Sequence, residues 1–190
     1  MVDLRVTLKA LSVAILCIYA TSSPGQVLEG DADALLNRLG TLTSEADAAE
    51  AARLAAEIQE RWTHSGSPTM DLLLRRGQEA IAAGDYPRAI AHLTALTDHA
   101  PRFAEGWNQR ATAFFLQERY GEALSDIEQV LILEPRHFGA MAGLGIILEG
   151  LGDTKGALRA FEAAAQVYPA EPNVQGAIER LQQQTGERTL

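Results

Sequence analysis

The chain has 190 residues, of which 47% are hydrophobic and 22% are charged, and its formal net charge at pH 7 is −9. This length and composition suit one ordinary globular domain and exclude a disordered or collagen-like class. The acidic balance argues against nucleic-acid binding, because phosphate contacts need clustered Lys and Arg side chains. It also predicts repulsion from anionic lipid headgroups.

The first residues have the order of a secretory signal peptide. Arg5 and Lys9 precede an apolar run over 10–20, and the small, polar segment TSSPGQ follows it. The run is too short to span a bilayer, which takes about 20 apolar residues. We therefore expect a signal peptide over 1–22 and an exported, periplasmic protein that contacts the membrane only through its leader before cleavage. Cys17, the single cysteine, lies in this leader, so packing and not disulfides must hold the exported protein together.

Two helices are expected after the leader, over 31–39 and 44–62. Ser44 and Asp47 have a capping-box-like arrangement at the start of the second helix, and apolar residues recur along that helix at helical intervals. The pair over 31–62 either caps the unit that follows or is a degenerate copy of it.

A 34-residue interval recurs through the rest of the chain, which is the signature of a repeat protein. Apolar residues follow each repeated alanine at spacings of four and seven, which keeps one face of a helix pointing inward. Each unit therefore predicts two helices joined by a tight turn. The units span 70–103, 104–137 and 138–171, and the residues at the 34-residue interval are Pro101, Pro135 and Pro169, and Ala89, Ala123 and Ala157.

These units resemble the tetratricopeptide repeat (TPR), whose pattern is W-x2-L-G-x2-Y, then A-x3-F, then P. The resemblance implies an all-α solenoid of three helical hairpins, preceded by the N-terminal helices and closed by a capping helix over 172–184. The sequence departs from the pattern at Arg76 and Arg110, which stand where the family has Leu. Because Asp126 faces Arg110 from the second helix of the same unit, we expect these two residues to pair.

The segment FGAMAGLGIILEGLGD, residues 138–153, has the apolar spacing of a helix but carries five glycines. Each glycine inside a helix costs about 1 kcal/mol relative to alanine. The repeat register assigns Gly145 to the crossing of the two helices, opposite Ala157, and Gly152 to the turn. Three explanations remain open for the other glycines: drift in a helix held by its neighbours, packing of helix 31–39 along them, or docking of a partner. They are Gly139, Gly143 and Gly150, which share one stripe with Ile146.

In proteins that this chain resembles, the corresponding stripe of each first helix lines a concave groove where ligands lie. The resemblance therefore implies a non-enzymatic protein–protein interaction module or scaffold in the cell envelope, which binds a peptide or a helix of unknown identity in the groove. The alternative is a self-assembling structural protein whose groove is filled by its own N-terminal helix or by another copy. The groove residues expected to contact the partner are Arg75, Gln78, Glu105, Asn108, Gln109, Thr112, Phe115, Gly143 and Ile146.

Some TPR domains hold the C-terminal carboxylate of chaperones with a clamp of Lys, Arg and Asn side chains in the groove. This chain lacks that clamp, which disfavours a chaperone tail as its ligand. The residues at the corresponding positions are Leu74, Gln78, Gln109, Gly139 and Gly143.

The sequence contains no recognisable catalytic motif. Its four histidines have no metal-ligand spacing among themselves, and His137, close to a proline, is expected in a solvated loop. The motifs of serine hydrolases, zinc proteases and phosphate-binding loops are absent. We therefore predict a protein without catalytic residues, bound metal or other cofactors.

Overall fold

The computed structural model describes residues 24–186, and the side chains of residues 32–186. The predicted leader over 1–22 lies outside these residues. The described part is all-helical, as the sequence predicts, and none of its helices is long and apolar enough to cross a membrane. In chain order the elements are α1 (Pro24–Gly40), the 3-10 turn η1 (Glu45–Asp47), α2 (Ala48–Trp62), α3 (Pro68–Ala82), α4 (Tyr86–His99), α5 (Ala104–Leu116), α6 (Tyr120–Leu133), α7 (Phe138–Gly150), α8 (Thr154–Val167) and α9 (Pro172–Thr185).

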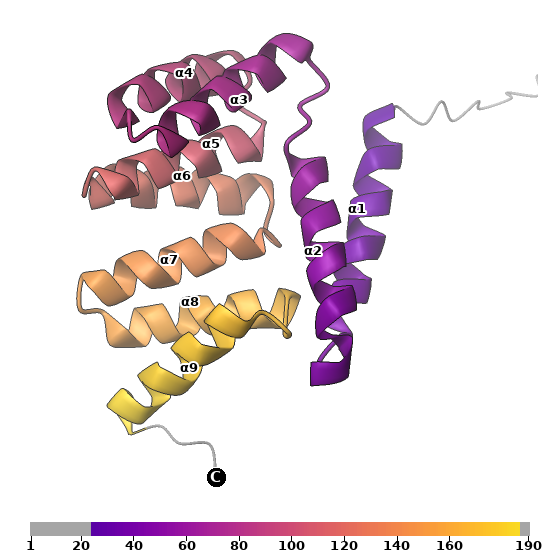
Figure 1. The fold of residues 1–190 in the computed structure, drawn as a ribbon, viewed down its shortest axis with the longest axis vertical. Coiled ribbons are helices and arrows are strands. Elements are labelled where there is room, and N and C mark those ends of the chain that lie inside the picture. The colour runs from indigo at the N-terminus through magenta and orange to yellow at the C-terminus, as the bar shows by residue number, and fades with distance from the viewer. Residues whose placement is uncertain (1–23, 187–190) are drawn as a thin grey trace, which may run out of the picture.

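Three helical hairpins stack on one another in chain order and form a short solenoid (Figure 1). They are α3–α4, α5–α6 and α7–α8, and α9 packs against α8 as the last layer. The three repeated alanines, Ala89, Ala123 and Ala157, are fully buried in the second helices of the hairpins. The predicted solenoid of three TPR-like hairpins with a C-terminal helix is thereby confirmed.

The turns inside the hairpins keep one geometry although their sequences differ. Gly84 and Gly152 adopt φ values of 73° and 83° in the first and third hairpins, a region that favours glycine. At the corresponding turn of the second hairpin, Glu118 adopts a φ of 60°, which strains a residue with a side chain. In the first and third hairpins, Asp85 and Asp153 then cap the second helix by accepting backbone hydrogen bonds of 3.2 and 2.9 Å.

Glycines in the first helices make room for large side chains of the second helices. A methyl group on Gly77 would lie 2.5 Å from Leu93 Cγ, and one on Gly145 would lie 2.8 Å from ring atoms of Phe161. The residue one turn after Ala157, Phe161, thus fills the space above Gly145. A ring at this position makes more dispersion contacts than a methyl group could.

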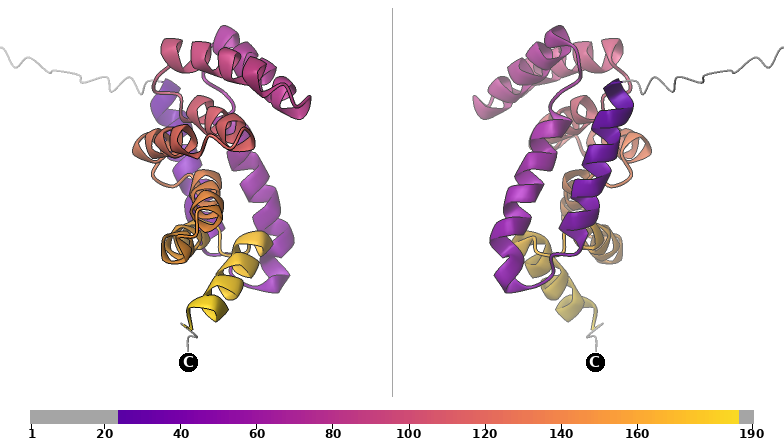
Figure 2. Two further views of the ribbon diagram at one scale, coloured as in Figure 1. Left: turned by 90° about the vertical axis from the view of Figure 1, so that its left-hand side faces the viewer. Right: turned by 90° about the vertical axis from the view of Figure 1, so that its right-hand side faces the viewer.

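The N-terminal helices form a hairpin that stands across the ends of α7 and α8 (Figures 1 and 2). Its apolar residues, among them Leu36 and Ile58, share one core with Phe138 of α7 and with Tyr168, which follows α8. The expectation that 31–62 caps the first repeat is therefore wrong. Two short amphipathic helices must cover their apolar faces, and the third hairpin supplies the aromatic rings for this.

The predicted helix over 31–39 lies within α1 and does not run along the glycine stripe of α7. It packs against α2 and against the end of α8, where the carbonyl oxygens of Gln166 and Val167 would lie 3.7 and 3.8 Å from a methyl group on Gly40. The explanation of the glycine stripe by packing of this helix is therefore wrong.

The second N-terminal helix begins as the sequence predicts. The backbone N–H and the hydroxyl of Ser44 both donate to Asp47 Oδ2, at 3.2 and 2.6 Å. The hydroxyl bond is the main reason why the pKa of Asp47 is lowered from its ordinary value. The capping box is formed around the short turn η1, and α2 follows directly.

Candidate peptide-binding cleft

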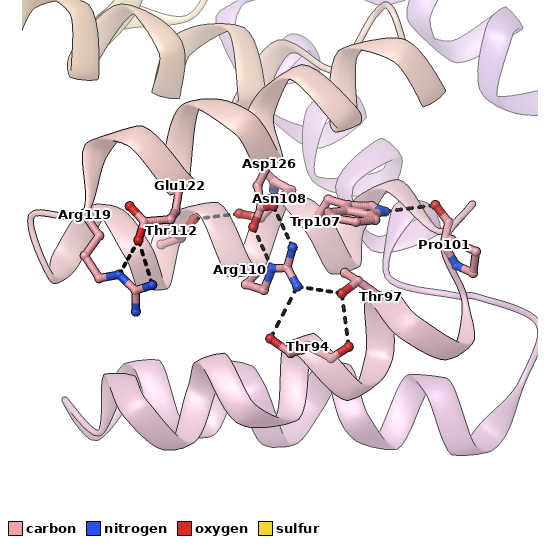
Figure 3. Close-up of polar contacts among 10 residues, drawn as sticks. All are labelled: Thr94, Thr97, Pro101, Trp107, Asn108, Arg110, Thr112, Arg119, Glu122 and Asp126. Atoms are coloured by element: carbon pink, nitrogen blue, oxygen red, sulfur yellow. Dashed lines mark hydrogen bonds and ion pairs between the residues drawn. The ribbon is translucent and has the colours of Figure 1, made fainter.

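Arg110 of α5 ties three helices together (Figure 3). Its Nε and one terminal nitrogen donate to the two carboxylate oxygens of Asp126 in α6, at 2.7 and 2.8 Å. The other terminal nitrogen donates to the hydroxyls of Thr97 and Thr94 in α4, at 2.9 and 3.3 Å. The guanidinium also lies 4.7 Å from the ring centroid of Trp107. The predicted pairing of Arg110 with Asp126 is confirmed, and the hydroxyls of α4 extend it to the preceding hairpin.

This cluster is part of the solenoid and not of an open surface. The side chains of Arg110 and Asp126 are only 14% and 5% exposed. A guanidinium with most of its donors engaged and an aromatic ring beside it has little left to offer a ligand. We therefore assign it to the packing of the first two hairpins.

A second polar network is buried where α2, α5 and α7 meet. His137 caps α7: its Nδ1 accepts a hydrogen bond from the Ala140 N–H at 3.0 Å. The ring proton is therefore on Nε2, which lies 3.2 Å from Glu105 Oε2 and donates to it. Trp62, the last residue of α2, stacks on the imidazole with the ring centroids 4.2 Å apart. The network joins the N-terminal hairpin to two successive repeats.

The buried network corrects two expectations. His137, expected in a solvated loop, is 2% exposed, and Glu105, expected to line the groove, is 7% exposed. The carboxylate of Glu105 is occupied inside the protein, where Asn108 and Gln109 also donate to it at 3.0 and 2.6 Å. Both corrected residues lie at the start of a first helix, and stacked hairpins bring these starts together. The contact between Glu105 and His137 could therefore have been predicted from their shared position in the repeat.

An open cleft of about 800 Å³ lies between α2, α7 and α9. Buried residues of the third hairpin, Phe138 and Phe161, lie at its base together with Tyr168. The rest of its lining consists mainly of small residues, together with a few polar side chains. These residues are Ala52, Ala55, Ala56 and Gln59 from α2, Gly139, Ala142, Ile146 and Glu149 from α7, Ala164 from α8, Glu171 before α9, and Pro172, Asn173, Val174, Gly176, Ala177 and Arg180 from α9.

The charged groups of the cleft are partly neutralised within it. Arg180 of α9 donates to both carboxylate oxygens of Glu149 in α7, each at 2.9 Å. Glu171 accepts hydrogen bonds from the Val174 N–H at 2.5 Å and from Asn173 Nδ2 at 2.9 Å, and so caps α9. The lining therefore holds two carboxylates and one guanidinium, a net negative charge.

The predicted groove residues are divided between this cleft and the rest of the solenoid. Ile146 lies in the cleft and is 50% exposed. Gly143 faces α6 instead, where a methyl group would lie 3.8 Å from Ile127 Cδ1. Phe115 packs on Tyr120 with ring centroids 5.9 Å apart. The remaining residues lie along α3 and α5: Arg75 and Thr112 are exposed, and Gln78, Asn108 and Gln109 are partly buried.

Sequence reasoning missed the contribution of α2 and α9 to the cleft. The repeat period relates only the hairpins to one another, and it contains no information on where a non-repeating hairpin docks. The sequence of α2 did contain a signal. Ala52 and Ala56 lie outside its apolar stripe, where polar residues would be expected.

The site has the chemistry of a binding surface. Most of the side chains that line it are apolar, and its polar side chains are those of Gln59, Glu149, Glu171, Asn173 and Arg180. Within residues 32–186, no group of three or more His, Cys, Asp or Glu side chains is placed to hold a metal ion.

Comparison with known proteins agrees with the repeat pattern. Two models of the tetratricopeptide repeat family match residues 74–132 and 114–181. A TPR repeat-containing protein of Rhizobium etli is 38% identical over 171 residues, which are 90% of this chain and 80% of that protein.

Solved structures share the fold at low sequence identity. The Sgt2 TPR domain from Aspergillus fumigatus superposes with a TM-score of 0.60 at 24% identity, over 64% of this chain and 82% of that domain. The first TPR of Spaghetti (RPAP3), bound to the HSP90 peptide SRMEEVD, gives a TM-score of 0.61 at 21% identity, over 63% of this chain and 95% of that one. These likenesses show the fold alone. Together with the matched family models and the Rhizobium relative, the stacked hairpins establish that the chain belongs to the tetratricopeptide repeat family.

Proposed function

We propose that this protein is a non-enzymatic interaction module that binds a segment of a partner protein in the cleft between α2, α7 and α9. The observation that carries the proposal is the exposure of apolar surface in a preformed hollow. Ile146 projects half-exposed beside a cleft of about 800 Å³ whose base is aromatic. A concave apolar site with a few polar groups at its edge is what ligand-binding sites generally look like, and isolated solvent-facing residues do not produce one.

The partner differs in chemistry from the chaperone peptide held by the RPAP3 domain. That peptide, SRMEEVD, is acidic at its C-terminal end. Where a carboxylate clamp would need basic side chains, this chain has Leu74, which is buried, and Gly139 and Gly143, which have no side chain. The net negative lining of the cleft also disfavours an acidic peptide.

The proposed place of action is the cell envelope. The basic, apolar and small-polar order of the leader over 1–22 supports export. Expression of the tagged full chain in a Gram-negative host, followed by fractionation and N-terminal sequencing, tests this. We expect a periplasmic product that begins close to Ser23. An uncleaved product confined to the cytoplasm would contradict export but not binding.

Site-specific crosslinking tests the binding function. A photo-crosslinking amino acid replaces Ala142, which lines the cleft, or Ser125, which is exposed on α6. We expect the first position to capture a defined partner that the second does not, and Ile146→Asp to abolish the capture. The matched control is Ile132→Asp on α6, because Ile132 is exposed (63%) but lies outside the cleft. Equal capture from both positions would contradict the proposal.

Self-association is the competing function, since a second copy could fill the cleft. Its signature is a molecular mass that rises with protein concentration in sedimentation or light scattering. Crosslinks from position 142 would then join two copies of this chain. A concentration-independent monomer mass excludes this alternative.

A further inference from the structure

Three glycines of this protein lie at points where two helices pack against each other. Gly77, Gly106 and Gly145 each receive a Leu or Phe side chain from the helix packed against them. A methyl group at these positions would lie 2.5 Å from Leu93, 3.0 Å from Leu96 and 2.8 Å from Phe161, respectively. Each glycine is thus a socket that is filled by one large apolar side chain, and its lack of a Cβ is explained by that neighbour.

Two glycines that line the cleft are sockets without an occupant. Gly176 lies in the interior of α9, and a methyl group there would meet no atom within 4 Å. Gly139 lies in the first turn of α7, and its nearest atom would be His137 Cε1 at 3.5 Å. Alanine would fit both positions within this chain, and it would favour the helix at Gly176. Gly121 and Gly150 are equally open but do not line the cleft, so what sets Gly139 and Gly176 apart is that they face one cleft together.

We propose that the occupant of the cleft is an amphipathic, positively charged α-helix of a partner protein, which inserts Leu or Phe side chains at Gly139 and Gly176. This inference rests on the proposed function and names the class of partner. The small walls allow the approach: Ala52 and Ala56 of α2 and Ala142 of α7 leave room for a helix axis at the close distance of about 8 Å that packed helices adopt.

The cleft favours a helix over an extended peptide because of backbone hydrogen bonding. An extended segment that is buried needs a partner for every N–H and C=O group. Most side chains that line this cleft are aromatic or aliphatic, and the polar ones, such as the exposed Gln59 and Asn173, are few. A helix satisfies its backbone internally and can therefore bury an apolar face against such walls.

Charge complementarity predicts the sign of the net charge of the partner helix. Two carboxylates, Glu149 and Glu171, and one guanidinium, Arg180, line the cleft, and the whole chain carries a formal charge of −9. Glu149 is already paired with Arg180, so Glu171 carries the remaining negative charge. Lys or Arg residues flanking the apolar face would be attracted to it, and acidic flanks would be repelled.

Selection from a peptide library tests the inference with the purified protein as bait. The probe is a displayed library of random 16-residue peptides, and each selected peptide is remeasured against three variants. Gly139→Leu combined with Gly176→Leu fills the sockets from within the chain. Gly121→Leu is the matched control, because Gly121 also lies in a first turn, in α6, and a methyl group there would meet no atom within 4 Å. Ile146→Asp tests the cleft without touching the sockets. Circular dichroism confirms that each variant stays folded.

We expect the selected peptides to be basic and amphipathic with Leu or Phe at helical spacing, and to lose at least tenfold in affinity for the filled variant but less than twofold for Gly121→Leu. Proline at the centre of a peptide should abolish its binding. Peptides that lose affinity for Ile146→Asp but not for the filled variant, or that bind in an extended form, would overturn the helix inference and leave the cleft function standing. Peptides indifferent to both variants, or none at all, would overturn both.

Discussion

At the scale of single residues, the solenoid depends on polar groups that sit where the repeat pattern has apolar ones. Arg110 stands where the family pattern has Leu, and it is accommodated because Asp126, Thr94 and Thr97 supply acceptors. A buried guanidinium is costly when it lacks a carboxylate. The position therefore tolerates Arg only together with its partners.

Removal of the carboxylate alone should be more harmful than removal of both charges. Asp126→Ala leaves the guanidinium of Arg110 buried beside hydroxyls only, and we expect a loss of about 3 kcal/mol in the free energy of unfolding. Adding Arg110→Leu should restore a large part of the lost stability, because Leu is the residue of the family pattern and needs no hydrogen-bond acceptor. Urea denaturation measures both variants. A double variant no more stable than Asp126→Ala would contradict this account of the pair.

Tyr168 predicts how stability depends on alkaline pH. Burial raises the pKa of its phenol above the ordinary value of about 10, and the charge of Glu171 acts in the same direction. Stability is therefore fully present below about pH 10 and is lost as pH rises towards the folded-state pKa, because the unfolded chain releases the proton more readily.

Tyr168→Phe should remove this contribution to the alkaline loss and change stability little at pH 7, because the ring of Tyr168 packs in an apolar core against the ring of Phe138. Thermal unfolding between pH 8 and pH 11 measures the difference. Tyr86→Phe is the control, because Tyr86 is only partly buried at the start of α4. An equal effect of both substitutions would contradict the assignment to Tyr168.

At the scale of helices, the periodic parts of the structure follow from the sequence and the non-periodic parts do not. The three hairpins follow from the 34-residue interval, because each unit must bury the same face against its neighbour. Gly145 was assigned to a helix crossing by the same register, but its occupant, Phe161, depends on the angle at which α8 crosses α7. The docking of α2 depends on Trp62 stacking on His137, a contact that no interval in the sequence relates.

The candidate site shows the same division. Ile146 lies on the predicted stripe and in the cleft. Glu105 shares the same kind of position on α5 but is drawn into the interior by His137, which comes from the next repeat. Whether a stripe residue faces solvent is thus decided by tertiary neighbours, and helical spacing alone does not contain that information.

Alanine should shift stability in opposite directions at a glycine that is covered by a large side chain and at a glycine that has open space above it. Gly145→Ala places a methyl group 2.8 Å from the ring of Phe161, and we expect a loss of about 2 kcal/mol from overpacking. Gly176→Ala meets no neighbouring atom and should gain up to about 1 kcal/mol from helix propensity. Calorimetry of the two variants checks the signs. Destabilisation by Gly176→Ala would show that its socket is occupied within the protein itself.

At the scale of the whole molecule, the two ends of the solenoid are closed in different ways. The C-terminal end is covered by α9. At the N-terminal end, Leu72 stands 34 residues before Gly106, the glycine into which Leu96 of the preceding helix packs. A leucine there would obstruct a further hairpin, and the exposed Arg76 gives the end a charged surface. The N-terminal hairpin packs instead on the third repeat.

The position of that hairpin couples the cleft to the rest of the fold, because α2 forms one of its walls. Trp62 holds α2 in place by stacking on His137 and by contacting Phe138, with ring centroids 4.2 and 5.2 Å apart. Trp62→Ala should cost about 3 kcal/mol and should release α1 and α2 before the repeats unfold, since local units of a protein open separately when their contacts are few. Affinity for the partner should also fall, because α2 forms one wall of the cleft.

Hydrogen exchange followed by mass spectrometry distinguishes release of the hairpin from general destabilisation. In Trp62→Ala, backbone amides of α2 should exchange much faster while those of α3 to α6 keep their protection. Trp107→Ala is the matched control: Trp107 donates its indole N–H to the Pro101 carbonyl at 2.9 Å and packs under Arg110, so its loss should instead raise exchange in α4 and α5. If both substitutions raised exchange equally throughout the described helices, the hairpin and the solenoid would be one cooperative unit, and the cleft could not open independently of the repeats.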